Sequence, residues 1–421
     1  MNYLSVTIDK LQNNQNVFLT GGAGVGKTTI TTQVIKHFEA EAKKVAKLAS
    51  TGMAATLIGG QTLHSFLDLG IAQDLEELEQ NGKLQPKKKI KKLLASIELI
   101  VIDEISMVSA DLFEMIALRL KQCEFSGVVL VVGDFLQLPP VVRGADEVFF
   151  AFESQAWSAM EFVKIELTHI FRTDDKAFIE ILHNVRFGLI DEQTHYALNE
   201  FIKPLPHDLS RFTFLFGKNN SATHHNRIEL DKIEGELFIK EAQIIKHKKT
   251  LSDKEVHRFI QDARIEKELA LKIGAPVLFT RNAWNYFNGE RGEVINIDEN
   301  YVYVQKSDGK VVKLEVQEQS KTQWVETKTS SGIEMQEESL LSIYQFPIKL
   351  AFGITIHKSQ GMSIEDLVIQ TNEIFAPSQF YVALSRSSNP KNLTLIAPQT
   401  QWYNLAYVNQ KAMQFVKEEV C

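Results

Sequence analysis

The residues with the clearest chemistry form a glycine-rich loop near the amino terminus. Residues 21–28 read Gly-Gly-Ala-Gly-Val-Gly-Lys-Thr and fit the pattern G-x-x-x-x-G-K-[ST]. Backbone N–H groups of such a loop surround phosphate oxygens, and the helix that follows adds a partial positive charge. The pattern predicts that Lys27 neutralises the β- and γ-phosphates of a nucleotide and that Thr28 holds Mg²⁺ by its hydroxyl group. The predicted nucleotide contacts of the loop are Gly22, Gly24, Val25, Gly26, Lys27, Thr28 and Thr29.

Two acids and an amide follow apolar segments further along the chain. Asp103 and Glu104 come directly after the apolar residues 99–102, and Gln137 follows the apolar residues 128–132. Asp103 is expected to hold Mg²⁺, directly or through a water molecule, and Glu104 to polarise the water that attacks the γ-phosphorus. Gln137 is expected to sense the γ-phosphate through an amide hydrogen bond.

Two arginines and one polar turn supply groups from elsewhere in the chain. Arg172 and Arg386 are predicted to reach the γ-phosphate as arginine fingers, because the guanidinium fork grips phosphate oxygens with two donors. The turn at residues 355–361 reads Thr-Ile-His-Lys-Ser-Gln-Gly. Gln360 and Gly361 are expected to face the nucleotide, and the other polar residues to contact a phosphodiester backbone. Those predicted DNA contacts are Thr355, His357, Lys358 and Ser359.

Small donors and one aromatic ring suggest a second set of DNA contacts. Residues 50–55 end an apolar segment, and residues 62–66 combine hydroxyl, imidazole and aromatic groups. Proteins bind single strands in this way, with polar groups on phosphates and aromatic rings under bases. A position in the hydrophobic core is the alternative for His64 and Phe66. The predicted DNA contacts in these segments are Thr51, Gly52, His64, Ser65 and Phe66.

The elements that must position these residues are short apolar strands that alternate with helical patterns. Residues 17–19, 99–102 and 128–132 are continuously apolar, and residues 45–48 are apolar except for Lys47. Such runs are typical of buried parallel strands. A doubly wound parallel sheet places its ligand at the carboxyl ends of the strands, where the motifs lie. A second α/β series is expected to begin at residues 162–167 and to continue at 212–216, 350–356, 367–370 and 393–396.

Two segments interrupt this α/β pattern. Residues 72–96 carry acidic residues first and lysines afterwards, and the segment is either a solvated amphipathic helix or an element that touches phosphate or separates strands. Residues 270–345 contain short alternating strands separated by Asn288-Gly289 and Asp308-Gly309 turns. That pattern predicts a small antiparallel barrel or sheet inserted into the second α/β unit.

Composition limits the class of protein. The chain has 421 residues, enough for two or three domains, and 44% hydrophobic and 24% charged residues are ordinary globular values. The net charge of −7 argues against wholesale coating of nucleic acid but leaves room for a local basic groove. Two cysteines exclude a Cys₄ zinc site and suggest a reducing compartment. We expect a soluble cytoplasmic protein, associated with the nucleoid if it is bacterial, with no membrane contact.

In these motifs the chain resembles superfamily 1 helicases of the 5′-to-3′ branch, most closely the petite-integration-frequency (PIF) family, with RecD-like helicases as cousins. Residues 21–29, 50–55, 102–107 and 133–140 resemble motifs I, Ia, II and III. Residues 171–172 with 184–188 resemble motif IV, and residues 355–361 and 381–386 resemble motifs V and VI. The pairing of Ile-His-Lys-Ser-Gln-Gly with Val-Ala-Leu-Ser-Arg is very specific to these helicases.

The resemblance implies an α/β fold with two RecA-like domains, at residues 1–160 and at 161–269 with 346–421. It also implies a wedge at about residues 67–96 and an SH3-like β-barrel at residues 270–345. The implied activity is ATP-dependent, 5′-to-3′ translocation on single-stranded DNA with unwinding of duplex, using ATP and Mg²⁺. Single-strand–duplex junctions are the implied substrates. A monomer is expected, and single-strand-binding, replication or repair proteins are expected partners.

The chain departs from the family pattern at two places. Two alternative functions also stay open. The family has a glutamine-containing adenine motif upstream, which Gln12 and Gln15 match poorly, and Thr173 stands where the family has glutamine. The first alternative function is a DNA-stimulated ATPase that acts as a switch or clamp without processive unwinding. The second is a small-molecule phosphotransferase, which gives no reason for the motifs at residues 355–386.

Overall fold

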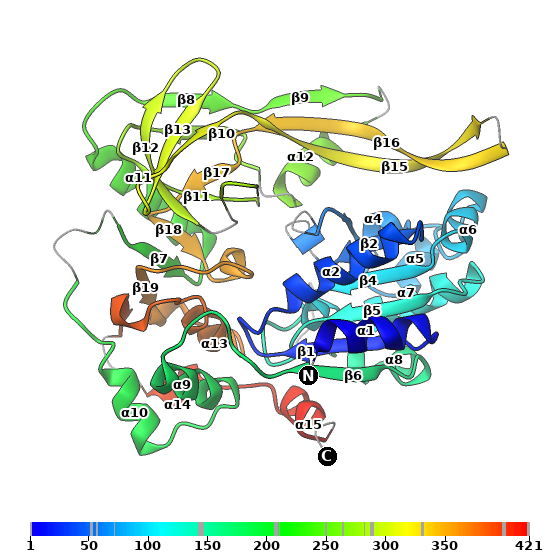
Figure 1. Ribbon diagram of the computed structural model, residues 1–421, viewed down its shortest axis with the longest axis horizontal. Coiled ribbons are helices and arrows are strands. Elements are labelled where there is room, and N and C mark those ends of the chain that lie inside the picture. The colour runs from blue at the N-terminus through cyan, green and yellow to red at the C-terminus, as the bar shows by residue number, and fades with distance from the viewer. Residues whose placement is uncertain are drawn as a thin grey trace.

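Two parallel α/β sheets lie side by side, and an antiparallel region extends over both (Figure 1). The computed structural model describes residues 2–50, 54–55, 58–70, 72–141, 147–205, 209, 211–248, 251–262, 265–281, 283–286, 290–329, 332–397 and 401–418. Among these residues, no helix is both long enough and apolar enough to cross a membrane.

The first domain is built on a six-stranded parallel sheet in the order β3-β2-β4-β5-β1-β6. Its strands are β1 (Val17–Gly21), β2 (Val45–Ala49), β3 (Gln61–Thr62), β4 (Leu99–Asp103), β5 (Val128–Val132) and β6 (Val163–Leu167). The longer helices of this domain are α1 (Tyr3–Gln12), α2 (Lys27–Ala40) and α7 (Ala110–Gln122), and the shorter ones are α4 (Leu63–Phe66) and α8 (Gln155–Ala159). β1, β4 and β5 are almost wholly buried, as their continuous apolar sequence predicts.

The segment expected to open the second α/β unit belongs to the first sheet instead. β6 pairs in parallel with β1 along its whole length, from Val17 opposite Val163 to Gly21 opposite Leu167. The first sheet therefore continues past the boundary expected at residue 160. A short apolar run predicts a strand, but its sequence does not identify the neighbouring strand.

The second domain is built on a four-stranded parallel sheet in the order β18-β7-β19-β20. Its strands are β7 (Thr213–Phe216), β18 (Gly353–Thr355), β19 (Leu367–Gln370) and β20 (Leu393–Ile396). Its helices are α9 (Lys176–Arg186), α10 (Glu192–Asn199), α11 (Asn219–Lys232), α13 (Gln379–Leu384) and α14 (Trp402–Leu405). The later strands of the expected second series are therefore confirmed.

The antiparallel region is wider than the segment expected at residues 270–345. β11 to β14 are the short alternating strands that the sequence predicts in this segment. The whole set comprises β8 (Phe238–Glu241), β9 (Gln243–Lys246), β10 (Glu268–Leu271), β11 (Pro276–Phe279), β12 (Arg291–Ile297), β13 (Val302–Lys306), β14 (Val311–Leu314), β15 (Gln317–Thr329), β16 (Gly332–Gln345) and β17 (Ile348–Leu350). α12 (Asp253–Asp262) lies between β9 and β10 in the chain. The predicted turn at Asn288-Gly289 lies outside the described residues. β15 and β16 form a long ribbon that reaches over the first domain (Figure 1).

The charge-segregated segment folds as two short helices, α5 (Leu75–Gln80) and α6 (Lys88–Ala95). α6 buries Ile90, Leu93 and Leu94 and leaves lysines exposed on its other face, as an amphipathic helix does. Arg119 of α7 is buried beneath the segment and donates hydrogen bonds to the carbonyl oxygens of Leu67, Lys83 and Leu84. The guanidinium group thus fastens the segment to the first domain.

The last helix returns to the first domain, although the sequence placed it in the second. α15 (Gln410–Glu418) lies near α8 and β6 in Figure 1. Val408, Ala412 and Val416 belong to the hydrophobic core on one face of the first sheet. Phe415 stacks on Phe152 with ring centroids 4.2 Å apart. The chain therefore crosses between the two domains once more at its end.

Candidate active site

The glycine-rich loop joins β1 to α2 at the carboxyl edge of the first sheet. Gly26 caps α2 with a left-handed backbone and without a side-chain hydrogen bond, so the first amides of the helix remain for an anion. Lys27 Nζ donates to the carbonyl oxygens of Gly21 (2.7 Å) and Gly22 (2.9 Å). Burial lowers the pKa of Lys27, and Asp134 and Glu104 oppose that effect. Thr28 is exposed on the first turn of α2.

The two predicted acids stand together at the end of β4. Glu104 has a left-handed backbone (φ 54°), and its N–H donates to Asp103 Oδ1 at 2.9 Å. Asp103 and Glu104 are half-buried, and burial raises the pKa of each carboxyl group. The pKa of Asp103 rises to about 7 because of burial and then because of the Glu104 charge. A cation beside these groups would favour their charged forms.

This donor set fits Mg²⁺ bound together with phosphate. Mg²⁺ prefers hard oxygen ligands and usually takes one or two carboxylates, water and substrate phosphates. The described residues hold no cluster of three or more His, Cys, Asp or Glu suited to a metal ion. Asp103 at the end of β4 and the Thr28 hydroxyl on α2 are the oxygen donors that could hold a phosphate-bound Mg²⁺.

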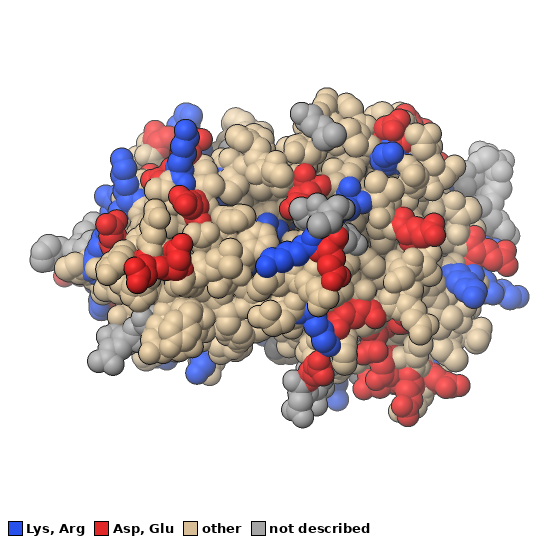
Figure 2. Space-filling model, turned by 90° about the horizontal axis from the view of Figure 1, so that it is seen from below, with Lys and Arg blue, Asp and Glu red and all other residues tan. Residues whose placement is uncertain are grey.

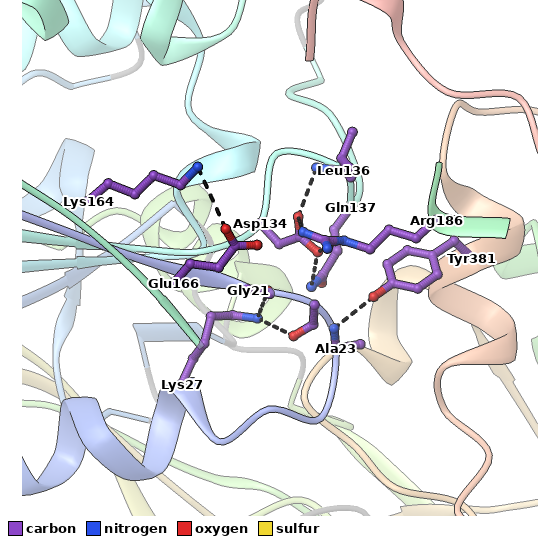
Figure 3. A network of polar contacts seen from close by, with 11 residues as sticks. Gly21, Ala23, Lys27, Asp134, Leu136, Gln137, Lys164, Glu166, Arg186 and Tyr381 are labelled. Atoms are coloured by element: carbon purple, nitrogen blue, oxygen red, sulfur yellow. Dashed lines mark hydrogen bonds and ion pairs between the residues drawn. The ribbon is translucent and has the colours of Figure 1, made fainter. Parts of the chain in front are cut away.

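Asp134 and Arg186 form a buried ion pair across the cleft. Arg186 at the end of α9 donates from Nη2 to Asp134 Oδ1 (2.9 Å) and from Nε to Oδ2 (3.2 Å). Asp134 also accepts from the Leu136 N–H (3.1 Å) and from Gln137 Nε2 (3.4 Å), as Figure 3 shows. Nearby Arg186 and Lys27 hold the pKa of Asp134 below its usual value despite burial. The predicted sensor Gln137 is thus part of an interdomain network.

Both predicted arginine fingers are held by hydrogen-bond acceptors of the second domain. Arg172 donates from Nε to Ser363 Oγ (2.9 Å) and from Nη1 to the Ser385 carbonyl oxygen (2.6 Å). Arg386 is 2% exposed, and its three nitrogens donate to the carbonyl oxygens of Val382 and Ser359 and to Ser385 Oγ. These acceptors are neutral, so they do not balance the two charges.

Burial acts on both guanidinium groups. It lowers the pKa of Arg172 to about 9, with help from the nearby charge of Arg386, and it lowers the pKa of Arg386 to about 10. Both groups remain cations at neutral pH. Two neighbouring positive charges, Arg172 half-buried beside the loop and Arg386 fully buried, favour a multiply charged anion close to them.

A close contact holds the segment before α9 against the loop. The Phe171 N–H donates to the Gly24 carbonyl oxygen at 2.9 Å. Gly24 has φ +77°, and a Cβ atom there would lie 2.8 Å from Arg172 Cβ. Only glycine fits this position without a shift of the backbone. The Phe171 ring is 70% exposed and faces Gly26, where it offers an apolar surface beside the loop.

The turn after β18 separates into exposed and buried groups. His357 and Lys358 are partly exposed in the short 3₁₀ helix at His357–Ser359. Ser359 is fully buried and donates to the Ile356 carbonyl oxygen at 2.7 Å, and buried Thr355 accepts from the Lys358 N–H. The expectation that Ser359 and Thr355 contact DNA is therefore corrected, because both hydroxyls serve the turn. Gln360 Nε2 is buried with no hydrogen-bond partner in the described part of the chain, which suits a group that faces a nucleotide.

The predicted DNA contacts of the first domain also differ in their exposure to solvent. Ser65 is exposed and His64 is partly exposed on α4. Phe66 is 6% exposed and packs in the hydrophobic core, so the expectation of a base-stacking ring is corrected in favour of its core alternative. Thr51 and Gly52 lie outside the described residues.

Sequence reasoning missed the contact that joins the loop to the second domain. Tyr381 of α13 accepts a hydrogen bond from the Ala23 N–H at 2.8 Å with its hydroxyl oxygen (Figure 3). The only signal in the sequence was that Tyr381 lies in the segment resembling motif VI. Gln12, the weak adenine-motif candidate, donates to Glu41 Oε1 just past the far end of α2, away from the loop.

Comparisons with known proteins agree with this geometry. The profile of the PIF1-like helicase family matches residues 4–196. The ATP-dependent DNA helicase Pif1 of Campylobacter jejuni is 40% identical over 98% of this chain and 96% of its own length. The protein of the same name from Bdellovibrio bacteriovorus is 32% identical over 98% and 90%. Pif1 from a Bacteroides species in complex with ADP-AlF4 aligns with a TM-score of 0.83 and 27% identity over 100% of this chain and 97% of its own.

Proposed function

The chain belongs to the PIF1-like helicase family and is an ATP-dependent DNA helicase, and on this premise we propose that it moves 5′ to 3′ along single-stranded DNA. Closure and opening of the cleft between the two parallel sheets would drive the movement. The observation that supports this cleft mechanism is that Lys27 of the first domain and Arg386 of the second both act electrostatically on Glu104. Arg172 also donates to the Ser385 carbonyl oxygen of the second domain. Groups from both sides of the cleft can then act on one ATP molecule. The 5′-to-3′ direction comes from the resemblance to the PIF family.

The proposed hydrolysis is an in-line attack of water on the γ-phosphorus of ATP. Glu104 accepts a proton from the attacking water, and the bond between the γ-phosphorus and the oxygen of ADP breaks. Lys27, Arg172 and Arg386 stabilise the charge that spreads over the γ-phosphoryl oxygens. Mg²⁺, held by Thr28 and Asp103, would supply further positive charge when it is bound. Gln137 reports the γ-phosphate to the Asp134–Arg186 pair.

The proposed DNA path crosses the carboxyl edges of both sheets. His64 and Ser65 of the first domain and His357 and Lys358 of the second would contact phosphates. Two observations support this path. These side chains keep solvent contact, and a Bacteroides Pif1 structure of the same fold is bound to ssDNA (TM-score 0.67, 28% identity). On the face seen from below, acidic side chains gather over the first domain, and such a surface repels phosphates (Figure 2).

Strand displacement tests the proposed direction. A duplex with a 5′ single-stranded tail and the same duplex with a 3′ tail are each mixed with the protein and ATP. The proposal predicts displacement from the 5′-tailed substrate and little from the 3′-tailed one. The reverse preference would contradict the direction, and displacement of neither substrate by a protein that hydrolyses ATP on DNA would favour the switch.

A further inference from the structure

Tyr381 connects the loop to the helix that carries one finger. It lies in α13, and Arg386 follows directly after the C-cap of that helix, Ser385. The Ser385 N–H donates to the Tyr381 carbonyl oxygen at 2.9 Å, and Arg386 Nε donates to the Val382 carbonyl oxygen at 2.9 Å. The backbone from Tyr381 to Arg386 is therefore one short hydrogen-bonded unit. Any shift of Tyr381 relative to the loop also shifts the finger.

The other end of the contact is a main-chain amide of the loop itself. The Tyr381 hydroxyl accepts from Ala23 N–H in a place where the tyrosine is 3% exposed. A Cβ atom at Gly22 would stand 3.1 Å from that hydroxyl and 3.8 Å from Arg186 Nε. The 3.8 Å separation from Arg186 is an ordinary contact, so the absence of a side chain at Gly22 matters for the close approach of the Tyr381 hydroxyl. A buried amide of this kind needs its acceptor, since an unpaired N–H in the interior is costly.

From these contacts we infer that Tyr381 is a positioning residue, whose hydroxyl sets the distance between the phosphate loop and Arg386 during hydrolysis. Near Tyr381, Arg186 and Asp134 join the same two domains through a bidentate ion pair. The tyrosine therefore adjusts the spacing of two domains that this ion pair already holds together. The inference rests on the proposed role of Arg386 as an arginine finger. It adds the residue that fixes the distance between Arg386 and the phosphate loop.

Tyr381→Phe removes only the hydroxyl and leaves the ring in the core of the second domain. We expect kcat for DNA-stimulated ATP hydrolysis to fall about ten-fold, the effect of one lost buried hydrogen bond. The KM for ATP should stay within about two-fold, because the finger acts mainly in the transition state. Tyr196→Phe is the matched control, since Tyr196 is 70% exposed on α10, and it should hydrolyse ATP like the wild type.

A double-mutant cycle shows whether Tyr381 acts on hydrolysis through Arg386 or independently of it. If Tyr381 acts through Arg386, the double variant Tyr381→Phe with Arg386→Ala should be no slower than Arg386→Ala alone. Wild-type kcat in Tyr381→Phe, or rate losses that multiply in the double variant, would overturn this inference and leave the helicase proposal standing. Normal hydrolysis by Arg386→Ala would overturn both the finger and the inference. Melting temperatures of all variants show whether each is folded.

Discussion

At the scale of single residues, the site brings carboxyl and guanidinium groups together in positions with little contact with water. Burial raises the pKa values of Asp103 and Glu104, and it lowers those of half-buried Arg172 and fully buried Arg386. Such groups are unfavourable in the empty fold and become favourable around a phosphate and its cation. The site therefore resembles a preorganised electrostatic environment for phosphoryl transfer.

Arg386→Ala should lose hydrolysis while it still binds ATP. The guanidinium group stabilises charge that develops in the transition state, so kcat should fall by about a thousand-fold or more. Binding of a fluorescent ATP analogue by titration and steady-state hydrolysis separate the two effects. Arg227→Ala, an exposed position on α11, is the control for loss of a positive charge. Lost binding together with lost hydrolysis in a folded Arg386→Ala protein would contradict a finger role.

At the scale of elements, the sequence predicted where the strands lie along the chain. It predicted less well which elements lie beside each other in the fold. The apolar runs that became β1, β4, β5 and β19 were predictable because buried parallel strands are continuously apolar. The places of β6 and α15 were not, because both depend on contacts with residues distant in the chain. The same limit explains the site: the loop motif identified Lys27, whereas local sequence did not reveal that Tyr381 reaches Ala23.

The docking of α15 makes a prediction about stability. Phe415 contacts Phe18, Phe135, Phe152 and Trp157, so Phe415→Ala should remove part of the first-domain core. We expect a loss of about 2 kcal/mol in unfolding free energy and a lower melting temperature by differential scanning fluorimetry. Phe375→Ala, at a ring that is 59% exposed, should melt like the wild type. Equal melting of both variants would mean that α15 contributes little.

α11 makes a prediction about pH. The His225 ring lies 4.5 Å from that of Phe214 and 5.2 Å from that of Phe216, and burial lowers its pKa. A lowered histidine pKa means that the unfolded chain binds the proton more readily. Stability is therefore full above about pH 6.5 and falls as the pH drops through the folded-state pKa. Melting temperatures between pH 8 and 5 should fall less in His225→Gln than in the wild type, whereas exposed His224→Gln should follow the wild type.

At the scale of the whole molecule, the two parallel sheets share both the proposed nucleotide site and the proposed DNA path. His64 belongs to the first domain and His357 to the second, so a change in the cleft alters their separation. His357→Ala should weaken binding of a single-stranded oligonucleotide in fluorescence anisotropy, by about three-fold to ten-fold for one lost charge-assisted or polar contact. His195→Ala, on α10, is a control outside the proposed path. Unchanged affinity of His357→Ala would move the DNA path elsewhere.

The most direct test of the central claim is steady-state ATP hydrolysis with and without a single-stranded oligonucleotide. A motor in which both sheets serve ATP and DNA together should hydrolyse ATP slowly alone and much faster on DNA. That stimulation should disappear in Lys27→Ala, because the variant lacks the lysine of the phosphate loop. Robust hydrolysis that is indifferent to DNA would contradict the coupling of the two sites.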